Sequence, residues 1–339
     1  MGSKVAVALG ITGLVSLFGG CTTSAKVTHF SGNTMGTTYQ VTYVAPGVSI
    51  RQEEIDALLA DINQSLSNYI ETSVISTVNA STDATVWYPV DAHFGAVFRR
   101  ARAIYNDTNG AFNPAVGPLV NAWGFGPVES QPLPDAATIR ALLDVVSLEA
   151  FELRDSPLAV RKHLDGAKLD FGGIAKGYGV DEIAALLEHR GIKNYVASIA
   201  GEVRARGQRP EGGGWHVGIG TPTENALAEQ RIHTVISLND SAVSTSGTYR
   251  NYRAEDGKTY AHIIDPKTGY PAMTNLVSVS VLARDAMTAD AYATALIVMG
   301  LDKGLQFVES HKELQAYFIA RDEDGNLIEK RSSGFPGQL

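Results

Sequence analysis

The sequence predicts an α+β fold in which grouped helices pack against mixed and antiparallel sheets. Some segments repeat apolar residues every three or four positions, as amphipathic helices do, and others repeat them every second position, as half-buried strands do. The strand-like segments come in runs and do not alternate singly with helices, which argues against a parallel βαβ architecture. A content of 44% hydrophobic residues with 34 glycines is typical of a globular chain with many turns.

The individual elements follow from this periodicity and from the turn residues between them. Helices are predicted at 51–67, 92–108, 135–143, 174–190, 285–299 and 302–311. Strands are predicted at 38–44, 145–153, 159–164, 167–171, 195–199, 215–219, 232–238, 260–264, 276–282 and 316–320. The Pro- and Gly-rich span 113–134 is predicted to be a long loop, and such loops often form the wall of a binding site. Residues 208–214 and 221–230 are expected to form surface turns.

The N-terminus carries the pattern of an export signal. Lys4 precedes an apolar run over residues 5–18, and two glycines then precede Cys21, the only cysteine of the chain. A run of about 14 residues is short for a membrane span and fits the core of a signal peptide. We expect residues 1–20 to be removed, Cys21 to be acylated as in bacterial lipoproteins, and residues 21–29 to form a tether. The alternative is ordinary signal cleavage that releases a soluble product.

Residues 30–339 are then expected to form one elaborated catalytic domain, or two closely joined lobes. The net charge of −8 and the pI near 5.5 provide no basic surface for nucleic acid, and the single cysteine excludes an internal disulfide. We therefore expect a periplasmic protein that its lipid anchors to a bacterial membrane, with the choice of inner or outer membrane left open.

Asp290 and Thr294 lie four residues apart on a predicted helix that is otherwise mostly apolar, so both side chains project from one helical face. An ionised carboxylate buried among apolar residues costs several kcal/mol unless something pairs with it. A divalent cation such as Mg²⁺ is a natural partner for two hard oxygen ligands. Simpler roles are available: Asp290 would complement the helix dipole, and Thr294 would bond back to a carbonyl.

A second stretch, from 168 to 181, predicts an anion site. The predicted strand runs into Gly172 and Gly173, and Lys176 follows at the start of a helix. Such helix starts bind phosphate because their N–H groups are unpaired and because glycines let the ligand approach the backbone. The spacing is neither that of a Walker A loop nor that of a kinase. A tight strand-to-helix turn without a ligand is the alternative.

A third stretch contains a histidine at a strand end. The segments 244–252 and 260–269 are each predicted to be a strand that ends in a polar turn, and the second contains His262 before the turn Asp265-Pro-Lys-Thr-Gly269. The turn would hold His262 in a fixed pose, although a lone strand histidine is often a core residue and Asp265 a turn former. Together the three stretches supply cation ligands, an anion site, an arginine and a histidine, as magnesium-assisted phosphoryl chemistry requires.

Several ordered motifs resemble those of the FAD:protein FMN transferases, the ApbE family, over residues 30–325. They are Asn33-Thr-Met-Gly-Thr37, Gly110-Ala-Phe-Asn-Pro114, Trp123-Gly-Phe-Gly126, Asp170-Phe-Gly-Gly-Ile-Ala-Lys-Gly-Tyr178, Thr245-Ser-Gly247, His262-Ile-Ile-Asp-Pro-Lys-Thr-Gly269 and Thr288-Ala-Asp-Ala-Tyr-Ala-Thr294. The resemblance implies an ApbE-like, T-fold-like architecture. The chain departs from the family pattern at Ala200-Gly201-Glu202, where two glycines often precede the polar residue, and at Thr248, where aspartate is common.

The resemblance also implies roles for single residues. Met35 and Tyr69 would contact the isoalloxazine ring of FAD. Asp181 is a candidate contact for the adenosine portion, with a solvated helix position as the alternative. Further FAD contacts would come from Ala111, Phe112, Asn113, Gly172, Tyr178 and Ile264. Mg²⁺ would be held by the Ala175 carbonyl and by the Asp290 and Thr294 side chains.

The implied reaction cleaves the FAD pyrophosphate, moves FMN onto a threonine hydroxyl of another protein and releases AMP. Lys176 and Mg²⁺ would draw charge from the pyrophosphate, and His262 would take the proton of the acceptor hydroxyl, with Asp290 as the rival base. The implied acceptors are periplasm-facing subunits of redox complexes, such as the Na⁺-translocating NADH:quinone oxidoreductase. The alternatives are a hydrolase that releases FMN and AMP without transfer, and a lipid-anchored solute-binding protein without turnover.

Overall fold

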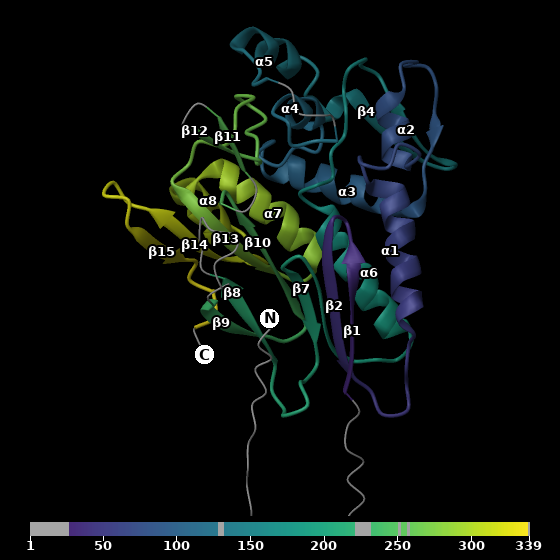
Figure 1. Ribbon diagram of the computed structural model, residues 1–339, viewed down its shortest axis with the longest axis vertical. Helices are drawn as coiled ribbons and strands as arrows, with labels where there is room; N and C mark the ends of the chain where they lie inside the picture. Colours follow the sequence, from purple (N-terminus) through teal and green to yellow (C-terminus); the bar gives the residue numbers. More distant parts are fainter. Residues whose placement is uncertain (1–26, 128–131, 221–231, 250–251, 256–257, 338–339) are drawn as a thin grey trace, which may run out of the picture.

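A computed structural model describes residues 27–127, 132–220, 232–249, 252–255 and 258–337. Its centre is a sheet of eight strands in the order β1-β2-β6-β7-β10-β13-β14-β15, in which every neighbouring pair is antiparallel (Figure 1). The strands are β1 (Val27–Thr34), β2 (Thr37–Val44), β6 (Asn194–Ile199), β7 (Glu202–Arg206), β10 (Ser241–Gly247), β13 (Leu276–Ala283), β14 (Gln315–Arg321) and β15 (Leu327–Arg331). The predicted α+β class with antiparallel sheets is confirmed.

Three small antiparallel sheets accompany the central one. One contains β3 (Tyr88–Pro89), β5 (Leu158–Lys162) and β4 (Phe151–Asp155), and the others are the pairs β8 (Trp215–Gly220) with β9 (Ile232–Leu238) and β11 (Tyr252–Glu255) with β12 (Lys258–Ala261). Figure 1 shows β11 and β12 beyond one end of the central sheet, beside α4.

All six predicted helices are present within one residue of their expected ends. They are α1 (Gln52–Leu66), α3 (Ala92–Asp107), α5 (Ala136–Leu143), α6 (Ala175–His189), α7 (Ala286–Met299) and α8 (Leu301–Ser310). Two short helices were not predicted, α2 (Val74–Ala80) and α4 (Gly117–Ala122), because each is too short to display helical periodicity. Side-chain caps begin several helices: Asp91, Asp135 and Asp285 each accept a hydrogen bond from the backbone N–H three residues on.

The central sheet is covered on both faces, which explains why every residue of β13 is buried. Along β14, Ala316, Phe318 and Ala320 face the main core with α6 and α7. The alternate residues Tyr317 and Ile319 face a second core with β8 and β9. This alternation is the two-residue period of a strand between two apolar layers.

Three sequence predictions are corrected. Residues 167–171 form no strand. The N–H and the carbonyl of Leu169 bond to the side chain of Asn79 and not to a neighbouring strand. Lys168 forms a single isolated bridge, with Val116. The strand expected at 145–153 begins at Phe151, after a short 3-10 helix over Leu148–Ala150. Residues 113–134 are not one open loop, because α4 lies within them and packs Leu119 and Trp123 against Ile139.

The predicted leader, tether start and Cys21 lie outside the described residues, as do residues 221–230. Within the described ranges, no helix is both long and apolar enough to cross a bilayer. Strand β12 ends at Ala261, short of the predicted end at residue 264, and Ile264 makes an isolated bridge to Pro271.

The close approach of α6 and α7 predicts a stability effect. A Cβ added at Gly177 of α6 would lie 2.3 Å from the carbonyl oxygen of Ala286 at the start of α7. Gly177→Ala is therefore expected to lower the free energy of unfolding by about 1–3 kcal/mol, because the two backbones must separate. Urea denaturation measures this change. Gly220→Ala, whose Cβ would meet nothing within 4 Å, is the control, and equal stability of the two variants would contradict the close packing.

Candidate functional site

The glycine stretch and the acidic helix, far apart in the sequence, meet at the starts of α6 and α7. Asp290 is 2% exposed, and its Oδ2 accepts a hydrogen bond of 3.0 Å from the Gly177 N–H. Its Oδ1 lies 4.0 Å from the Lys176 Nζ. Burial raises the pKa of Asp290 to about 7, with Lys176 opposing the shift and Glu202 adding to it. Asp290 does not cap its own helix, since Asp285 does so.

Asp181 supplies the converse contact, from α6 to α7. Its Oδ1 accepts from the Ala286 N–H at 2.9 Å and from Arg204 Nη1 at 2.8 Å, and its Oδ2 accepts from the Met287 N–H at 2.8 Å. The side chain is 11% exposed, so the alternative of a solvated helix position is wrong. Each helix start is thus held by a carboxylate of the other helix. The expected contact of Asp181 with adenosine stays a prediction.

Thr294 lies one turn beyond Asp290 on α7. Its hydroxyl faces Gly173, where an added Cβ would lie 2.9 Å from Oγ1, and it is 3.5 Å from the Ser246 Oγ on β10. The same Cβ would lie 3.4 Å from the ring of Phe112. A residue larger than glycine at position 173 would therefore push into both neighbours.

The glycine turn is not an open cradle of N–H groups. Gly172 donates its N–H to Asp170, Ile174 and Ala175 donate theirs to the Phe171 carbonyl, and Gly177 donates to Asp290. The expectation that unpaired backbone amides would bind phosphate is corrected for these four groups, since internal acceptors already use them. Lys176 is the positive group of this turn.

We assigned no role to Glu202 from the sequence, although the segment Ala200-Gly201-Glu202 corresponds to a position of the family pattern. Glu202 is the first residue of β7, its side chain is 7% exposed, and its Oε1 lies 3.1 Å from the Lys176 Nζ. In the sequence it belongs to Glu202-Val-Arg-Ala-Arg206, whose alternating charges are typical of a solvated strand face. The turn before it contains Ala200 at φ +56°, a conformation that costs energy for a residue with a Cβ.

A second group of predicted residues gathers at Phe125. The Tyr69 side chain is 70% exposed, and its hydroxyl donates to the Phe125 carbonyl at 3.1 Å. The His262 ring stands edge-on to the Phe125 ring, with centroids 6.3 Å apart. The following turn is confirmed, because the Asp265 side chain accepts from the Lys267 N–H and the Thr268 hydroxyl.

Asp170 connects the residues at the starts of α6 and α7 with the residues around Phe125. Most of the Tyr69 side chain is exposed, but partial desolvation of its hydroxyl end raises the pKa of that group, and the negative charge of Asp170 raises it further. Asp170 in turn accepts the Gly172 N–H at 2.7 Å. The buried charges of the α6 turn and the exposed Tyr69 therefore border one region.

Met35 forms the tip of the β1–β2 hairpin. It has φ +49° and is followed by Gly36 at φ +71°, so both central residues of this two-residue turn are left-handed. A hollow is lined by residues 33–38, and the Met35 methyl lies 3.1 Å from a Cβ position at Gly179 on α6. Because Met35 has a Cβ, the left-handed conformation costs energy at this position, and strained residues of this kind cluster at functional sites.

The remaining FAD contacts implied by the resemblance are buried or held by local bonds. Ala111 and Phe112 follow the left-handed residues Asn109 and Gly110 at the end of α3. Asn113 accepts the Ala115 N–H at its Oδ1, at 2.8 Å, and the Tyr178 hydroxyl bonds to His93 Nδ1 at 2.7 Å. Ile264 packs with Leu119 and Trp123. Their contacts with FAD stay predictions.

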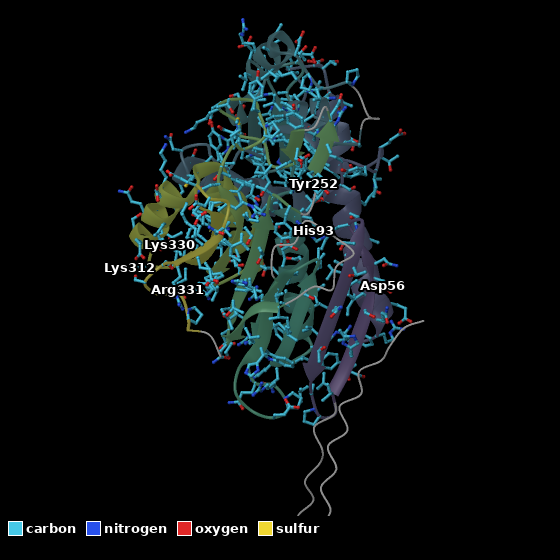
Figure 2. All side chains as sticks on the ribbon, turned by 60° about the vertical axis from the view of Figure 1, so that its left-hand side comes forward. Asp56, His93, Tyr252, Lys312, Lys330 and Arg331 are labelled. Atoms are coloured by element: carbon cyan, nitrogen blue, oxygen red, sulfur yellow. The ribbon has the colours of Figure 1, made fainter. Side chains whose placement is uncertain are left out.

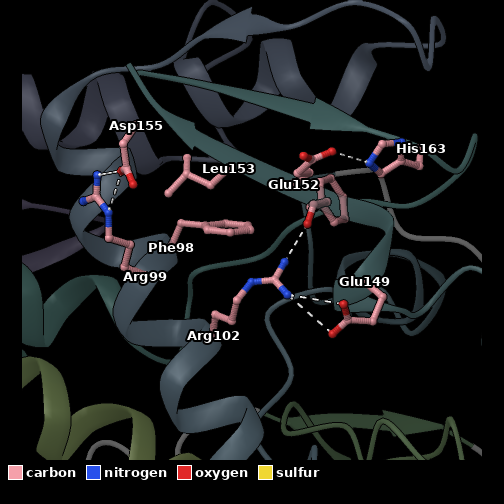
Figure 3. Close-up of a pocket in the computed structure, with 9 residues that line it drawn as sticks. Phe98, Arg99, Arg102, Glu149, Glu152, Leu153, Asp155 and His163 are labelled. Atoms are coloured by element: carbon pink, nitrogen blue, oxygen red, sulfur yellow. Dashed lines mark hydrogen bonds and ion pairs between the residues drawn. The ribbon is translucent and has the colours of Figure 1, made fainter. Parts of the chain in front are cut away.

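Another hollow lies between α3 and β4 (Figure 3) and contains none of the predicted residues. Its charged side chains are already paired, Arg99 with Asp155 at 2.6 Å and Arg102 with Glu149 at 3.4 Å. It offers no uncompensated charge to a ligand, and we do not assign the active site to it.

The donors at the start of α7 fit a hard divalent cation. Asp290 and Thr294 provide a carboxylate and a hydroxyl on successive turns, and Ala175 is the first residue of the adjoining α6. In the described part of the chain, no three His, Cys, Asp or Glu side chains gather as an all-protein metal cage. Such a sparse oxygen set fits Mg²⁺ completed by substrate phosphates and water better than a closed structural metal site.

Comparisons with known proteins show which family and which solved structures this chain is similar to. The family model of the ApbE family matches residues 35–318. The FAD:protein FMN transferase of Haemophilus influenzae is 39% identical over 93% of this chain and 92% of its own length, and that of Vibrio cholerae is 37% identical over 94% and 95%. The structure of the flavin transferase ApbE from Vibrio cholerae matches with a TM-score of 0.82 at 36% identity, covering 92% of this chain and 98% of that one. The apo flavinyl transferase ApbE of Pseudomonas stutzeri gives 0.81 at 32%, covering 91% and 95%.

The contacts of Asp181 predict a structural role for this residue. Asp181→Asn keeps the size of the side chain and removes its charge, so it is expected to lower the free energy of unfolding by about 1.5–3 kcal/mol, the usual loss for hydrogen bonds to a charged group. Chemical denaturation measures the loss. Asp302→Asn, at an exposed position of α8, is the control. Stability equal to that of the unaltered chain would refute the structural role, and weaker AMP binding by folded Asp181→Asn would support the adenosine contact.

Proposed function

This chain belongs to the ApbE family and is a flavin transferase, and we propose that it moves FMN from FAD to a threonine hydroxyl of an acceptor protein with the help of Mg²⁺. The observation that carries the proposal is the buried Asp290 beside Lys176, one helical turn from the Thr294 hydroxyl. A buried carboxylate with a hydroxyl one helical turn away and a lysine nearby is the arrangement expected where a cation meets a pyrophosphate.

The residues of the α6 turn would bind and polarise the pyrophosphate. Lys176 reaches from the helix start toward Asp290 and the Gly172 carbonyl, so its ammonium group can neutralise charge on the bridging oxygen as AMP leaves. The Ala175 carbonyl, Asp290 and Thr294 would hold Mg²⁺, which withdraws further charge from the phosphates when bound. The Gly177 N–H holds one Asp290 oxygen in place, so the carboxylate needs no reorientation.

His262 would remove the proton of the acceptor hydroxyl. The threonine oxygen forms a bond to the FMN phosphorus, the bond from that phosphorus to the bridging oxygen breaks, and AMP leaves with the bridging oxygen. Histidine has an ordinary pKa suited to this transfer near neutral pH. The Phe125 ring and the turn at Asp265 hold His262 in place. Tyr69, which also contacts Phe125, would contact the isoalloxazine ring together with Met35 of the β1–β2 hairpin.

Exposed apolar side chains near His262 provide a surface for the acceptor. Met273 is 96% exposed, and the preceding Ala272 donates its N–H to the Ile263 carbonyl, so Met273 lies beside the His262 segment. Tyr252, on β11, is a second exposed apolar side chain of this region and is labelled in Figure 2. Aromatic and methionine side chains are common anchors of protein interfaces. A protein acceptor, which needs such a surface, is thereby favoured over water.

The two alternative functions, a hydrolase and a solute-binding protein, would give different products from the transferase. Incubation of the chain with FAD, Mg²⁺ and a threonine-containing acceptor fragment should give AMP and a covalently fluorescent acceptor in equal amounts. AMP and free FMN without labelled acceptor would indicate the hydrolase, and the absence of AMP would indicate a binding protein.

We further propose that the acceptors are periplasm-facing subunits of redox complexes, such as the Na⁺-translocating NADH:quinone oxidoreductase, and that lipid on Cys21 holds the chain to the membrane.

Removal of the proposed cation ligand should abolish the reaction. Asp290→Ala is expected to lose Mg²⁺-dependent labelling of the acceptor, because the carboxylate would hold the ion and also accepts the Gly177 N–H at the α6 start. In-gel flavin fluorescence measures labelling, and a cooperative thermal transition confirms that the variant is folded. Asp302→Ala should label normally. Normal labelling by Asp290→Ala, or labelling that resists EDTA, would disprove the cation role.

Removal of the proposed base should slow the reaction without preventing FAD binding. His262→Ala is expected to reduce the transfer rate by about 10²- to 10⁴-fold, the usual contribution of general base catalysis. FAD affinity, measured by quenching of flavin fluorescence, should remain nearly unchanged. A large loss of FAD affinity would instead make His262 a binding residue, and an unchanged rate would favour Asp290 as the base.

A further inference from the structure

Lys176 lies between two buried carboxylates. Its Nζ is 3.1 Å from Oε1 of Glu202 and 4.0 Å from Oδ1 of Asp290. The two acid side chains are 7% and 3% exposed. With both acids ionised, this buried group carries one more negative charge than positive charge, which is costly in a poorly solvated place.

Glu202 has bonding capacity that the described residues do not use. Its Oε1 contacts Lys176, whereas its Oε2 is buried and has no hydrogen-bond partner among the residues that the structure describes. A buried carboxylate oxygen without a partner loses its hydration without compensation, so such atoms are rare unless a ligand or ion completes them.

The backbone before Glu202 directs the side chain into this position at some cost. Ala200 and Gly201 connect β6 to β7 with φ +56° and +130°, and Glu202 pairs with Ile199 directly after the turn. An alanine in the left-handed region is strained relative to a glycine. Strained turns persist where the surrounding structure requires a side chain in a particular place.

We propose that Glu202 is a further residue of the cation site and supplies its second negative charge. This inference rests on the proposed function, because it concerns the same divalent ion. The ion would remove the excess negative charge that Asp290 and Glu202 share, and it would satisfy, directly or through its water, the oxygen of Glu202 that has no partner. Lys176 competes with the ion for the same two carboxylates.

Binding of Mn²⁺ alone to the purified full chain tests the proposal without any turnover. The electron paramagnetic resonance signal of free Mn²⁺ falls as the ion binds, which gives the dissociation constant. Glu202→Gln keeps an oxygen that can face Lys176 and removes the charge. It is expected to weaken Mn²⁺ binding about tenfold or more, in the range found when residues around a metal are changed. Glu309→Gln, an equal charge change at an exposed residue, should bind as the unaltered chain does.

A second variant keeps the test decisive if Glu202→Gln does not fold. Lys176→Gln removes the competing positive charge and leaves both carboxylates to the ion, so Mn²⁺ binding should tighten about tenfold. Unchanged Mn²⁺ affinity in folded Glu202→Gln would overturn the proposal, as would unchanged or weaker affinity in Lys176→Gln. Asp290→Asn distinguishes failure of this proposal from failure of the proposed function. If Asp290→Asn loses Mn²⁺ binding whereas Glu202→Gln does not, the cation site stands and only the role of Glu202 is wrong. If Asp290→Asn binds Mn²⁺ normally, the cation site of the proposed function is itself wrong.

Discussion

The structure depends on two carboxylates, each of which accepts hydrogen bonds from the start of the other's helix. Asp290 of α7 accepts the Gly177 N–H of α6, and Asp181 of α6 accepts the Ala286 and Met287 N–H groups of α7. The first N–H groups of a helix have no partner within it, so a buried helix start needs an acceptor from elsewhere. These reciprocal hydrogen bonds provide acceptors for both helix starts. The absence of a side chain at Gly177 lets the two backbones approach closely enough to form them.

These reciprocal hydrogen bonds also determine the electrostatics of the site. Carboxylates that cap buried helix starts are taken out of water, and burial raises the pKa of both Asp181 and Asp290. Arg204 compensates Asp181 directly, at 2.8 Å. Asp290 shares the nearby cation Lys176 with Glu202. The two ends of the helix contact therefore differ: one is neutralised within the protein, and the other retains negative charge that a divalent cation can use.

The buried charges and the exposed residues have different tasks in the proposed transfer. The α6 and α7 groups are fixed by backbone hydrogen bonds and by the sheet behind them, which suits the polarisation of a phosphate at a fixed point. Tyr69 and His262 lie at Phe125, outside that core, where a second protein can reach them. A group transfer between two large molecules needs both properties, a rigid site for the donor and an open side for the acceptor.

Local pattern determined most of the elements and part of the site. The six longer helices were predictable because their apolar spacing repeats over at least two turns, and Asp290 with Thr294 was recognisable because a charge on an apolar helix is costly. The short helices α2 and α4 lack that repetition, and residues 167–171 have strand-like alternation although the Asn79 side chain takes the place of a partner strand. Only the tertiary structure revealed that Glu202, in a segment of alternating charges, is buried against Lys176, and that the amides of the glycine turn are already used. Sequence periodicity records which side of an element is apolar, whereas the partner of a polar group comes from a distant part of the chain and is decided by packing.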